Sequence, residues 1–177
     1  EPQVRRAVTC TTRPPRTGER PGVDYHFLAP DDFARRRAAG EFLESARVHG
    51  QWYGTLRGEV VTKLDQGTDV LLNIDVQGAA AVRTAAETDP RLRQALVSVF
   101  LAPPSLAELE QRLRGRGTDR EEAIRRRLEA AHGEIDHWRH FDYLLVSATI
   151  PEDLRRMRAV LEVERMRTRR QAAWDVV

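Results

Sequence analysis

The chain of 177 residues contains one cysteine, one lysine and no long hydrophobic run. The single cysteine, Cys10, excludes a disulfide within the chain and is typical of proteins from a reducing compartment. No apolar run approaches the roughly 20 residues that a membrane-spanning helix needs, and no signal peptide opens the sequence. We therefore expect a cytoplasmic protein without a membrane span.

The charge balance is close to neutral, with 29 basic and 27 acidic residues and a formal net charge of +2. This balance argues against a general nucleic-acid-binding function, which needs a strongly basic face. Almost all of the positive charge is arginine, since Lys63 is the only lysine. The length suits one domain with a sizeable core, and we expect that domain to span residues 1–177.

Strand and helix patterns alternate from Asp69 onward. Asp69–Val76 is the clearest buried strand, a mostly apolar run, and further strands are expected at 96–101 and 141–146. This alternation predicts right-handed crossovers and an α/β fold with a parallel sheet flanked by helices. The helices of this half are expected at 78–88, 105–113, 119–138 and 151–170.

The first half of the chain has a different pattern. A strand is expected at Val4–Thr9, and a helix from about Pro30 to Gly40. Residues 41–48 and 51–55 alternate on either side of a short turn, which predicts a hairpin. We expect the segment from about Tyr25 to Leu64 to form a small inserted lobe.

The stretch from Thr9 to Tyr25 is organised around two arginines. Arg13 and Arg16 stand on either side of Pro14-Pro15, and prolines make such a loop stiff. Two guanidinium groups held in this way match a doubly charged oxyanion such as a phosphate, and Tyr25 adds a phenolic donor. Taken alone, the stretch is equally well interpreted as an arginine-rich surface turn.

Two carboxylates are candidates for a binding site. Asp75 comes at the end of the buried strand, where open α/β sheets bind ligands, and Gly78 permits close backbone approach. Glu44 has apolar neighbours and could accept two N–H bonds from guanine, whereas adenine does not offer that pair. The alternatives are a helix-capping aspartate and an ordinary exposed glutamate.

Arg112, Arg116 and Arg127 lie in or beside a glycine-broken basic loop. Arginines on a mobile loop can neutralise the charge that develops during phosphoryl transfer and close only when substrate is bound. The alternative is a solvated charged face on two helices.

Together these segments resemble guanylate kinase over nearly the whole chain. Several long motifs occur in the family's order, which makes the resemblance specific. The motifs are T-T-R-P-P-R-T-G-E-R-P-G-V-D-Y-H-F at 11–27, G-E-F-L-E-S-A-R-V-H-G-Q-W-Y-G-T at 40–55, N-I-D-V-Q-G-A at 73–79 and L-A-P-P-S-L-A-E-L-E-Q-R-L-R-G-R-G-T-D at 101–119.

The resemblance implies a P-loop kinase fold and transfer of the γ-phosphoryl group of ATP to GMP, with magnesium. It implies a GMP-binding lobe at 9–64 and a lid region at 112–127. The residues implied for the GMP phosphate are Arg13, Arg16, Tyr25 and Tyr53. Those implied for guanine are Thr9, Glu44, Thr55 and Asp75. Those implied for the ATP phosphates and the transition state are Arg112, Arg116 and Arg127.

The sequence departs from the family pattern at several positions. Threonine replaces the usual serine at Thr9 and Thr55, which keeps the hydroxyl. Asn73 stands where an acidic residue is common, which weakens the case for a role in orienting magnesium-bound water. Ser147-Ala148 replaces an Asn-Asp pair, which weakens the contact expected near the adenine.

The family's opening strand and G-x-x-x-x-G-K-[ST] loop have no counterpart in this sequence. That loop cradles the ATP phosphates with backbone N–H groups, and its strand would be central to the sheet, so its absence would leave two unpaired edges. We expect the gene product to have residues before Glu1 that complete the enzyme, and these 177 residues alone to be inactive.

Three other functions are weighed against the kinase. A catalytically inactive guanylate kinase-like module that binds phosphorylated peptides is favoured by the absent P-loop, but opposed by Glu44, Asp75 and the lid arginines. A kinase of sugar phosphates is opposed by Glu44 with Thr9 and Thr55. An RNA-binding domain is opposed by the near-neutral charge.

Overall fold

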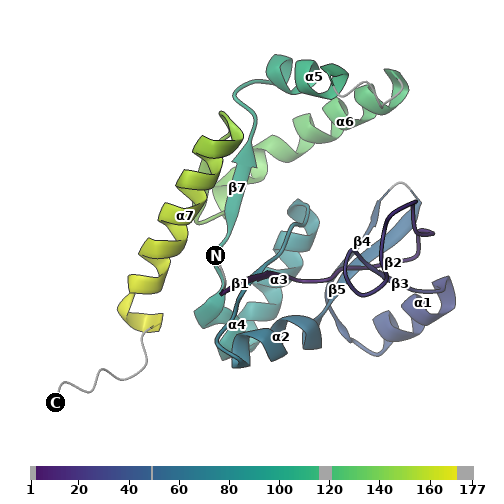
Figure 1. Cartoon of the computed structure of the whole chain (residues 1–177), viewed down its shortest axis with the longest axis vertical. Coiled ribbons are helices and arrows are strands. Elements are labelled where there is room, and N and C mark those ends of the chain that lie inside the picture. The colour runs from purple at the N-terminus through teal and green to yellow at the C-terminus, as the bar shows by residue number, and fades with distance from the viewer. Residues whose placement is uncertain (1–2, 49, 116–120, 171–177) are drawn as a thin grey trace. The chain divides into compact units, whose positions relative to one another are not determined.

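The computed structural model of the chain describes residues 3–48, 50–115 and 121–170. The chain folds into two compact units, Glu1–Leu96 and Val97–Val177. Figure 1 labels helices and strands of both units. Within the described ranges, no helix is both long and apolar enough to cross a membrane.

The first unit contains a short parallel strand pair with helices packed around it. β1 (Val4–Arg6) pairs with β6 (Asp69–Leu71). The helices of this part are α2 (Arg57–Asp65), α3 (Val76–Thr88) and α4 (Pro90–Ala95). The buried residues of its core are Ala7, Leu43, Val60, Val82, Ala86 and Leu92.

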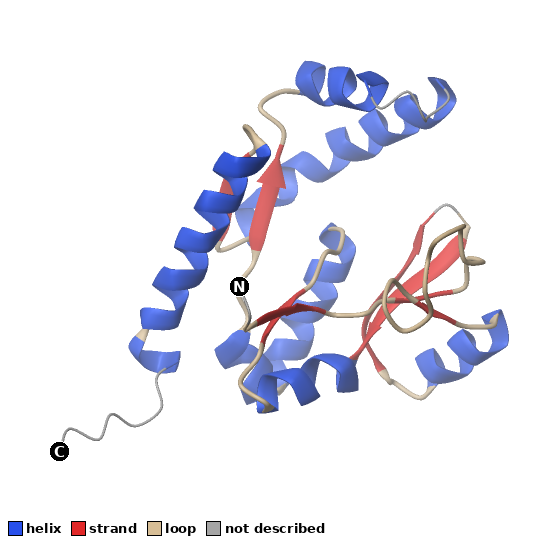
Figure 2. Ribbon diagram, in the orientation of Figure 1, coloured by secondary structure: helices blue, strands red, loops and turns tan. Residues whose placement is uncertain are grey.

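The first unit also contains a four-stranded sheet in the order β3-β2-β5-β4; strands are drawn in red in Figure 2. Its strands are β2 (Cys10–Thr11), β3 (His26–Phe27), β4 (Phe42–Val48) and β5 (Gln51–Leu56). α1 (Pro30–Ala38) packs on this sheet through buried Phe33, whose ring stacks on Phe42 at 4.3 Å between centroids. The expected hairpin and the helix that precedes it are therefore present.

The only cysteine of the sequence lies inside this sheet. Cys10 on β2 is fully buried, and burial raises the pKa of its thiol to about 11. The thiol is therefore protonated at neutral pH and is not a reactive nucleophile.

The second unit is built on a second parallel strand pair. β7 (Val99–Ala102) pairs with β8 (Tyr143–Val146). Ser98 and Asp142, which precede the two strands, are joined by hydrogen bonds. The Asp142 carboxylate accepts the backbone N–H and the hydroxyl of Ser98, both at 2.7 Å. The helices are α5 (Leu106–Gly115), α6 (Glu121–Glu134), the 3-10 helix η1 (Ile135–His140), α7 (Ile150–Met166) and the 3-10 helix η2 (Thr168–Arg170).

The structure differs from the sequence expectations in three ways. The predicted strand Asp69–Val76 pairs only as far as Leu71, because its partner β1 has three pairing residues before the chain turns toward β2. Within the described residues, β1–β6 and β7–β8 are separate parallel pairs, one in each unit, and β2 and β3 also pair in parallel within the four-stranded sheet. The helix α4 was not predicted, although Asp89 followed by proline is a recognisable start: the Asp89 carboxylate accepts the N–H groups of Arg91 and Leu92.

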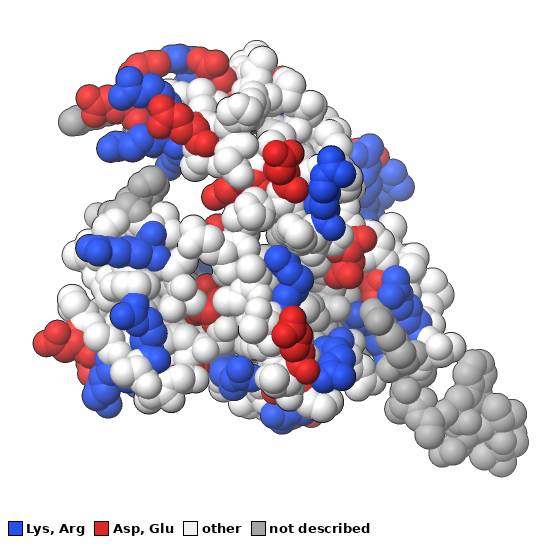
Figure 3. Space-filling model, turned by 180° about the vertical axis from the view of Figure 1, so that it is seen from behind, with Lys and Arg blue, Asp and Glu red and all other residues white. Residues whose placement is uncertain are grey.

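Charges of both signs are mixed over the surface. On the face drawn in Figure 3, basic and acidic side chains are interspersed. Many arginines are paired with a carboxylate three or four residues away on the same helix, as in Arg114 with Glu110 and Arg156 with Glu152. This pairing agrees with the near-neutral composition.

Candidate functional site

The first cluster of predicted site residues is built by the β4–β5 hairpin. Glu44 on β4 lies opposite Thr55 on β5, and both are buried, with 6% and 1% of their surface exposed. Gly54 permits this close pairing, since an added Cβ would lie 2.9 Å from the Glu44 carbonyl oxygen. The hydroxyl of Thr55 forms no hydrogen bond of acceptable geometry within the described residues. A buried hydroxyl without a partner is costly unless a ligand satisfies it.

Asp75 adds a second carboxylate close to that of Glu44, and Gly78 lies beside both. Asp75 is the N-cap of α3, and its Oδ1 accepts the Gly78 N–H at 2.8 Å. A methyl group at Gly78 would lie 3.1 Å from Glu44 Oε2 and 3.4 Å from Asp75 Oδ1. Both carboxylates therefore converge on Gly78. The capping interpretation of Asp75 is confirmed, and its geometry leaves Oδ2 for a further contact. We call Glu44, Thr55, Asp75 and Gly78 the carboxylate cluster.

The environment of Glu44 disfavours its charged form. Burial raises the pKa of Glu44 and the neighbouring Asp75 charge adds to the increase, whereas the approach of the Thr55 hydroxyl and backbone opposes it. An N–H donor brought to this carboxylate would replace the water that burial has removed.

The second cluster lies on the loop that follows β2. Arg13 Nη2 contacts both carboxylate oxygens of Glu19, at 2.8 and 3.0 Å, and Arg13 Nη1 donates to the Pro14 carbonyl at 2.6 Å. The same Glu19 carboxylate accepts the backbone N–H of Arg16 at 2.7 Å. The side chain of Arg16 is exposed. We call residues 12–25 the arginine loop.

Two tyrosines complete this second cluster. The Arg13 guanidinium carbon lies 5.4 Å from the centre of the Tyr25 ring, and Tyr25 meets Tyr53 edge to face at 6.1 Å. Hydrogen bonding to Glu19 and, to a smaller degree, to Tyr53 raises the pKa of Arg13. The structure therefore brings together three of the four residues predicted for a phosphate.

The arginine loop is tied to the body of the first unit. Arg6 Nη2 donates to the carbonyl oxygens of Val23 and Asp24, at 3.2 and 2.8 Å. The turns at Gly18 and Gly22 have φ of 88° and 75°, which only glycine adopts without strain. Thr9 leads into this loop, and its carbonyl accepts the His26 N–H at 2.9 Å. Sequence reasoning did not single out Glu19 or Arg6, because their partners depend on how the loop folds back.

The residues predicted for the lid lie in the second unit or outside the described residues. Arg112 on α5 donates to Glu108 Oε1 and Ser147 Oγ, both at 2.9 Å, and to the Ala148 carbonyl at 3.2 Å. Ser147 Oγ in turn donates to Asp153 at 2.7 Å. Arg127 is exposed on α6. Arg116 lies outside the described residues.

Arg112 is therefore found beside Ser147-Ala148, the pair that the resemblance implies near an adenine. The Ala148 N–H donates to Asp153 at 2.8 Å, and this bond, with that of Ser147, lowers the pKa of Asp153. Asp153 is consequently a fixed anion at neutral pH. It holds the turn before α7 in the conformation that Arg112 contacts.

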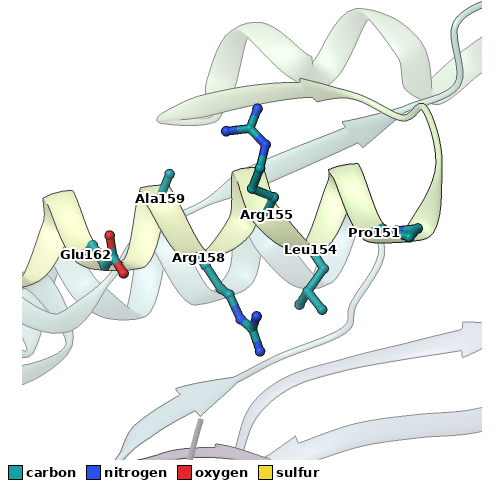
Figure 4. Close-up of a pocket in the computed structure, with 6 residues that line it drawn as sticks. All are labelled: Pro151, Leu154, Arg155, Arg158, Ala159 and Glu162. Atoms are coloured by element: carbon teal, nitrogen blue, oxygen red, sulfur yellow. The ribbon is translucent and has the colours of Figure 1, made fainter.

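Neither a metal site nor the surface pocket adds a candidate residue. Within the described ranges, no group of three or more His, Cys, Asp or Glu residues could hold a metal ion. Asn73, where an acidic residue would be common, is exposed. Figure 4 shows the open pocket on α7, lined by Pro151, Leu154, Arg155, Arg158, Ala159 and Glu162. None of these is a predicted site residue.

Comparison with known proteins gives one consistent family. The guanylate kinase family model matches residues 2–164. The guanylate kinase of Gluconobacter oxydans is 44% identical over 171 residues, which cover 97% of this chain and 79% of the relative. That of Symbiobacterium thermophilum is 45% identical over 172 residues, covering 97% and 78%.

A solved structure gives the same result. The crystal structure of guanylate kinase from Anaplasma phagocytophilum has a TM-score of 0.78 and 34% sequence identity, and the match covers 97% of this chain and 81% of that one. The family model and the identity to its curated members together assign the chain: it belongs to the guanylate kinase family.

Proposed function

We propose that this protein transfers the γ-phosphoryl group of ATP to GMP, giving ADP and GDP. The observation that carries this proposal is the buried carboxylate of Glu44, which lies beside the Thr55 hydroxyl and converges with Asp75 on Gly78. Such an arrangement has a strong preference for a ligand that donates two hydrogen bonds from one edge.

Guanine is the purine that supplies those donors, through its ring N–H and its exocyclic amine. The two Glu44 oxygens accept both, and Thr55 and Asp75 Oδ2 would contact the same edge, with Thr9 as the fourth guanine residue. Adenine lacks the ring N–H, so it would leave a buried carboxylate unpaired. A site built in this way rejects the wrong ligand by a factor of roughly 10⁴.

The arginine loop is proposed to bind the phosphate of GMP. Arg13 and Arg16 supply charge-assisted donors, and Tyr25 and Tyr53 supply phenolic ones. Two cations on one loop match the double charge of a phosphate monoester, so this part of the site recognises the phosphate and the carboxylate cluster recognises the base.

The lid arginines are proposed to act on the transferring group. An oxygen of the GMP phosphate attacks the γ-phosphorus of ATP, the bond to the β-phosphate oxygen breaks, and that oxygen leaves with ADP. Cations stabilise the charge on the equatorial oxygens during this step. The proposed residues are Arg112, Arg116 and Arg127. If Arg116 acts on the transition state, Arg116→Ala lowers kcat more than it lowers GMP affinity.

Magnesium is proposed to come with ATP. No group of three or more His, Cys, Asp or Glu residues occurs among the described residues, and Mg²⁺ that binds through the phosphates of ATP does not need such a group. The proposed partners are GMP and ATP, the proposed compartment is the cytoplasm, and no role for nucleic acid or a membrane is proposed.

The full-length gene product tests the reaction directly. We expect ADP formation from ATP and magnesium only when GMP is present, and little formation when AMP replaces GMP. A coupled ADP assay measures both, with GMP omitted as the control. A full-length product that binds GMP but forms no ADP would contradict the proposal, and binding of phosphorylated peptides would then be examined instead.

A further inference from the structure

The arginine loop contains one acidic residue whose carboxylate binds both halves of the proposed phosphate site. Glu19 contacts the Arg13 guanidinium through both oxygens and accepts the Arg16 backbone N–H through one of them. With 20% of its side chain exposed, against 14% for Arg13, it is a partly shielded partner rather than a solvated surface charge.

We propose that Glu19 is a positioning residue for GMP: it orients Arg13 and fixes the backbone at Arg16 so that the arginine loop is ready to receive the phosphate. This inference rests on the proposed function. It assigns to Glu19 no contact with GMP itself.

The hydrogen bonds of Arg13 leave donors for a ligand. A guanidinium group has five N–H donors. One Nη1 hydrogen is used by the Pro14 carbonyl, and Glu19 occupies Nη2. The Nε–H and the second Nη1 hydrogen are not used by these two partners, and the Tyr53 hydroxyl competes for one of them. Glu19 therefore fixes the plane of the guanidinium without using all of its donors, which is what preorganisation of an anion site requires.

The hydrogen bond between Glu19 and Arg16 holds the backbone of Arg16 and not its side chain. The Arg16 N–H is held by Glu19, and the Glu19 N–H donates to the Arg16 carbonyl at 3.0 Å. This reciprocal pair closes the turn that contains Gly18. The turn sets where the Arg16 side chain leaves the backbone, so one carboxylate orients the Arg13 guanidinium and fixes the backbone at Arg16.

Charge gives a second reason for an acid at this position. The arginine loop contains Arg13, Arg16 and Arg20 in one short segment, and repulsion between like charges opposes a compact loop. The Arg13 guanidinium and the Arg16 N–H hold the pKa of Glu19 below its usual range. Glu19 therefore stays ionised and balances part of this charge at neutral pH.

The test compares Glu19→Gln with a matched pair elsewhere in the first unit. Arg36 and Glu41 form an ion pair of the same 2.8 Å length outside the arginine loop, so Glu41→Gln is the control. In the full-length protein, calorimetry is expected to give roughly tenfold weaker GMP binding for Glu19→Gln. Guanosine affinity, the thermal unfolding midpoint and KM for ATP are expected to change little. Glu41→Gln is expected to bind GMP like the wild type.

A double-mutant cycle separates positioning from direct binding. If Glu19 acts through Arg13, Glu19→Gln added to Arg13→Lys lowers GMP affinity much less than it does alone. Glu19→Asp keeps the charge but is one methylene shorter, so an intermediate GMP affinity is expected.

Three results would overturn the inference: unchanged or tighter GMP binding by Glu19→Gln, equal loss of GMP and guanosine, or full additivity with Arg13→Lys. Tighter binding would mean that Glu19 competes with the phosphate. Each of these three results leaves the proposed function intact as long as the wild type prefers GMP to AMP. A wild type that shows no such preference would contradict both the proposed function and the inference about Glu19.

Discussion

The carboxylate cluster and the arginine loop differ in burial and in how far their polar groups already have partners. Glu44 and Thr55 are almost fully buried, and the cluster is costly without a ligand because burial desolvates its carboxylate. The arginine loop is partly exposed, and the Arg13 guanidinium already has a partner in Glu19. Under the proposed function, specificity for guanine would come from the buried acceptors and affinity for the phosphate from the preorganised charges.

A substitution of Arg13 is expected to give the largest effect that separates the arginine loop from the carboxylate cluster. Arg13→Lys keeps the charge but loses the planar fork, so we expect GMP affinity to fall roughly 10- to 100-fold while guanosine affinity stays constant. Raising the salt concentration from roughly 0.05 M to roughly 0.5 M should weaken GMP binding and leave guanosine binding nearly unchanged. Calorimetry measures the affinities for GMP and for guanosine, in the wild type and the variant and at each salt concentration. Equal losses for GMP and guanosine would show that the two clusters are not separable.

Gly78→Ala is the corresponding change in the carboxylate cluster. The new methyl group would lie 3.1 Å from Glu44 Oε2 and from the Ile74 Cβ, so the carboxylate must move. We expect GMP and guanosine affinity to fall together by roughly tenfold, since a small misplacement of a buried acceptor weakens both hydrogen bonds. Gly58→Ala is the control, because a Cβ there meets nothing within 4 Å. Loss of GMP affinity alone would place Gly78 with the phosphate instead.

The smallest effect is expected on the stability of the ligand-free protein. The pKa of Glu44 is raised by burial, so the folded state binds more protons than the unfolded state and stability falls as pH rises through the folded pKa. Glu44→Gln removes this dependence. We expect the variant to gain stability relative to the wild type as the pH rises from about 4, the ordinary pKa of a glutamate, toward neutral, measured by urea unfolding at each pH. A difference that is constant over this range would contradict the raised pKa.

Local signals in the sequence were sufficient for much of the fold. Pro30 and Gly40 mark the ends of α1, and the alternation on either side of Gly50 gave the β4–β5 hairpin. The length of β6 could not be predicted, because a strand ends where its partner ends, and β1 pairs over three residues only.

The candidate site could be predicted in its residues but not in its contacts. Glu44 and Asp75 were identified from their places on or near strands, yet their convergence depends on α3 approaching β4 at Gly78. Glu19 stood within a recognised motif without a role, because its bonds to Arg13 and Arg16 arise from the fold of the loop. Residue types indicate the chemistry, and tertiary structure decides which residues meet.

The central claim is that the buried Glu44 carboxylate selects guanine, and calorimetry with GMP, IMP and AMP tests it most directly. IMP keeps the ring N–H of guanine but lacks the exocyclic amine, and AMP lacks the ring N–H. We expect the full-length wild type to bind GMP most tightly, IMP roughly tenfold more weakly and AMP roughly 10⁴-fold more weakly, and Glu44→Gln to lose most of this order. Equal binding of GMP and AMP by the wild type, or an unchanged order in Glu44→Gln, would contradict the claim.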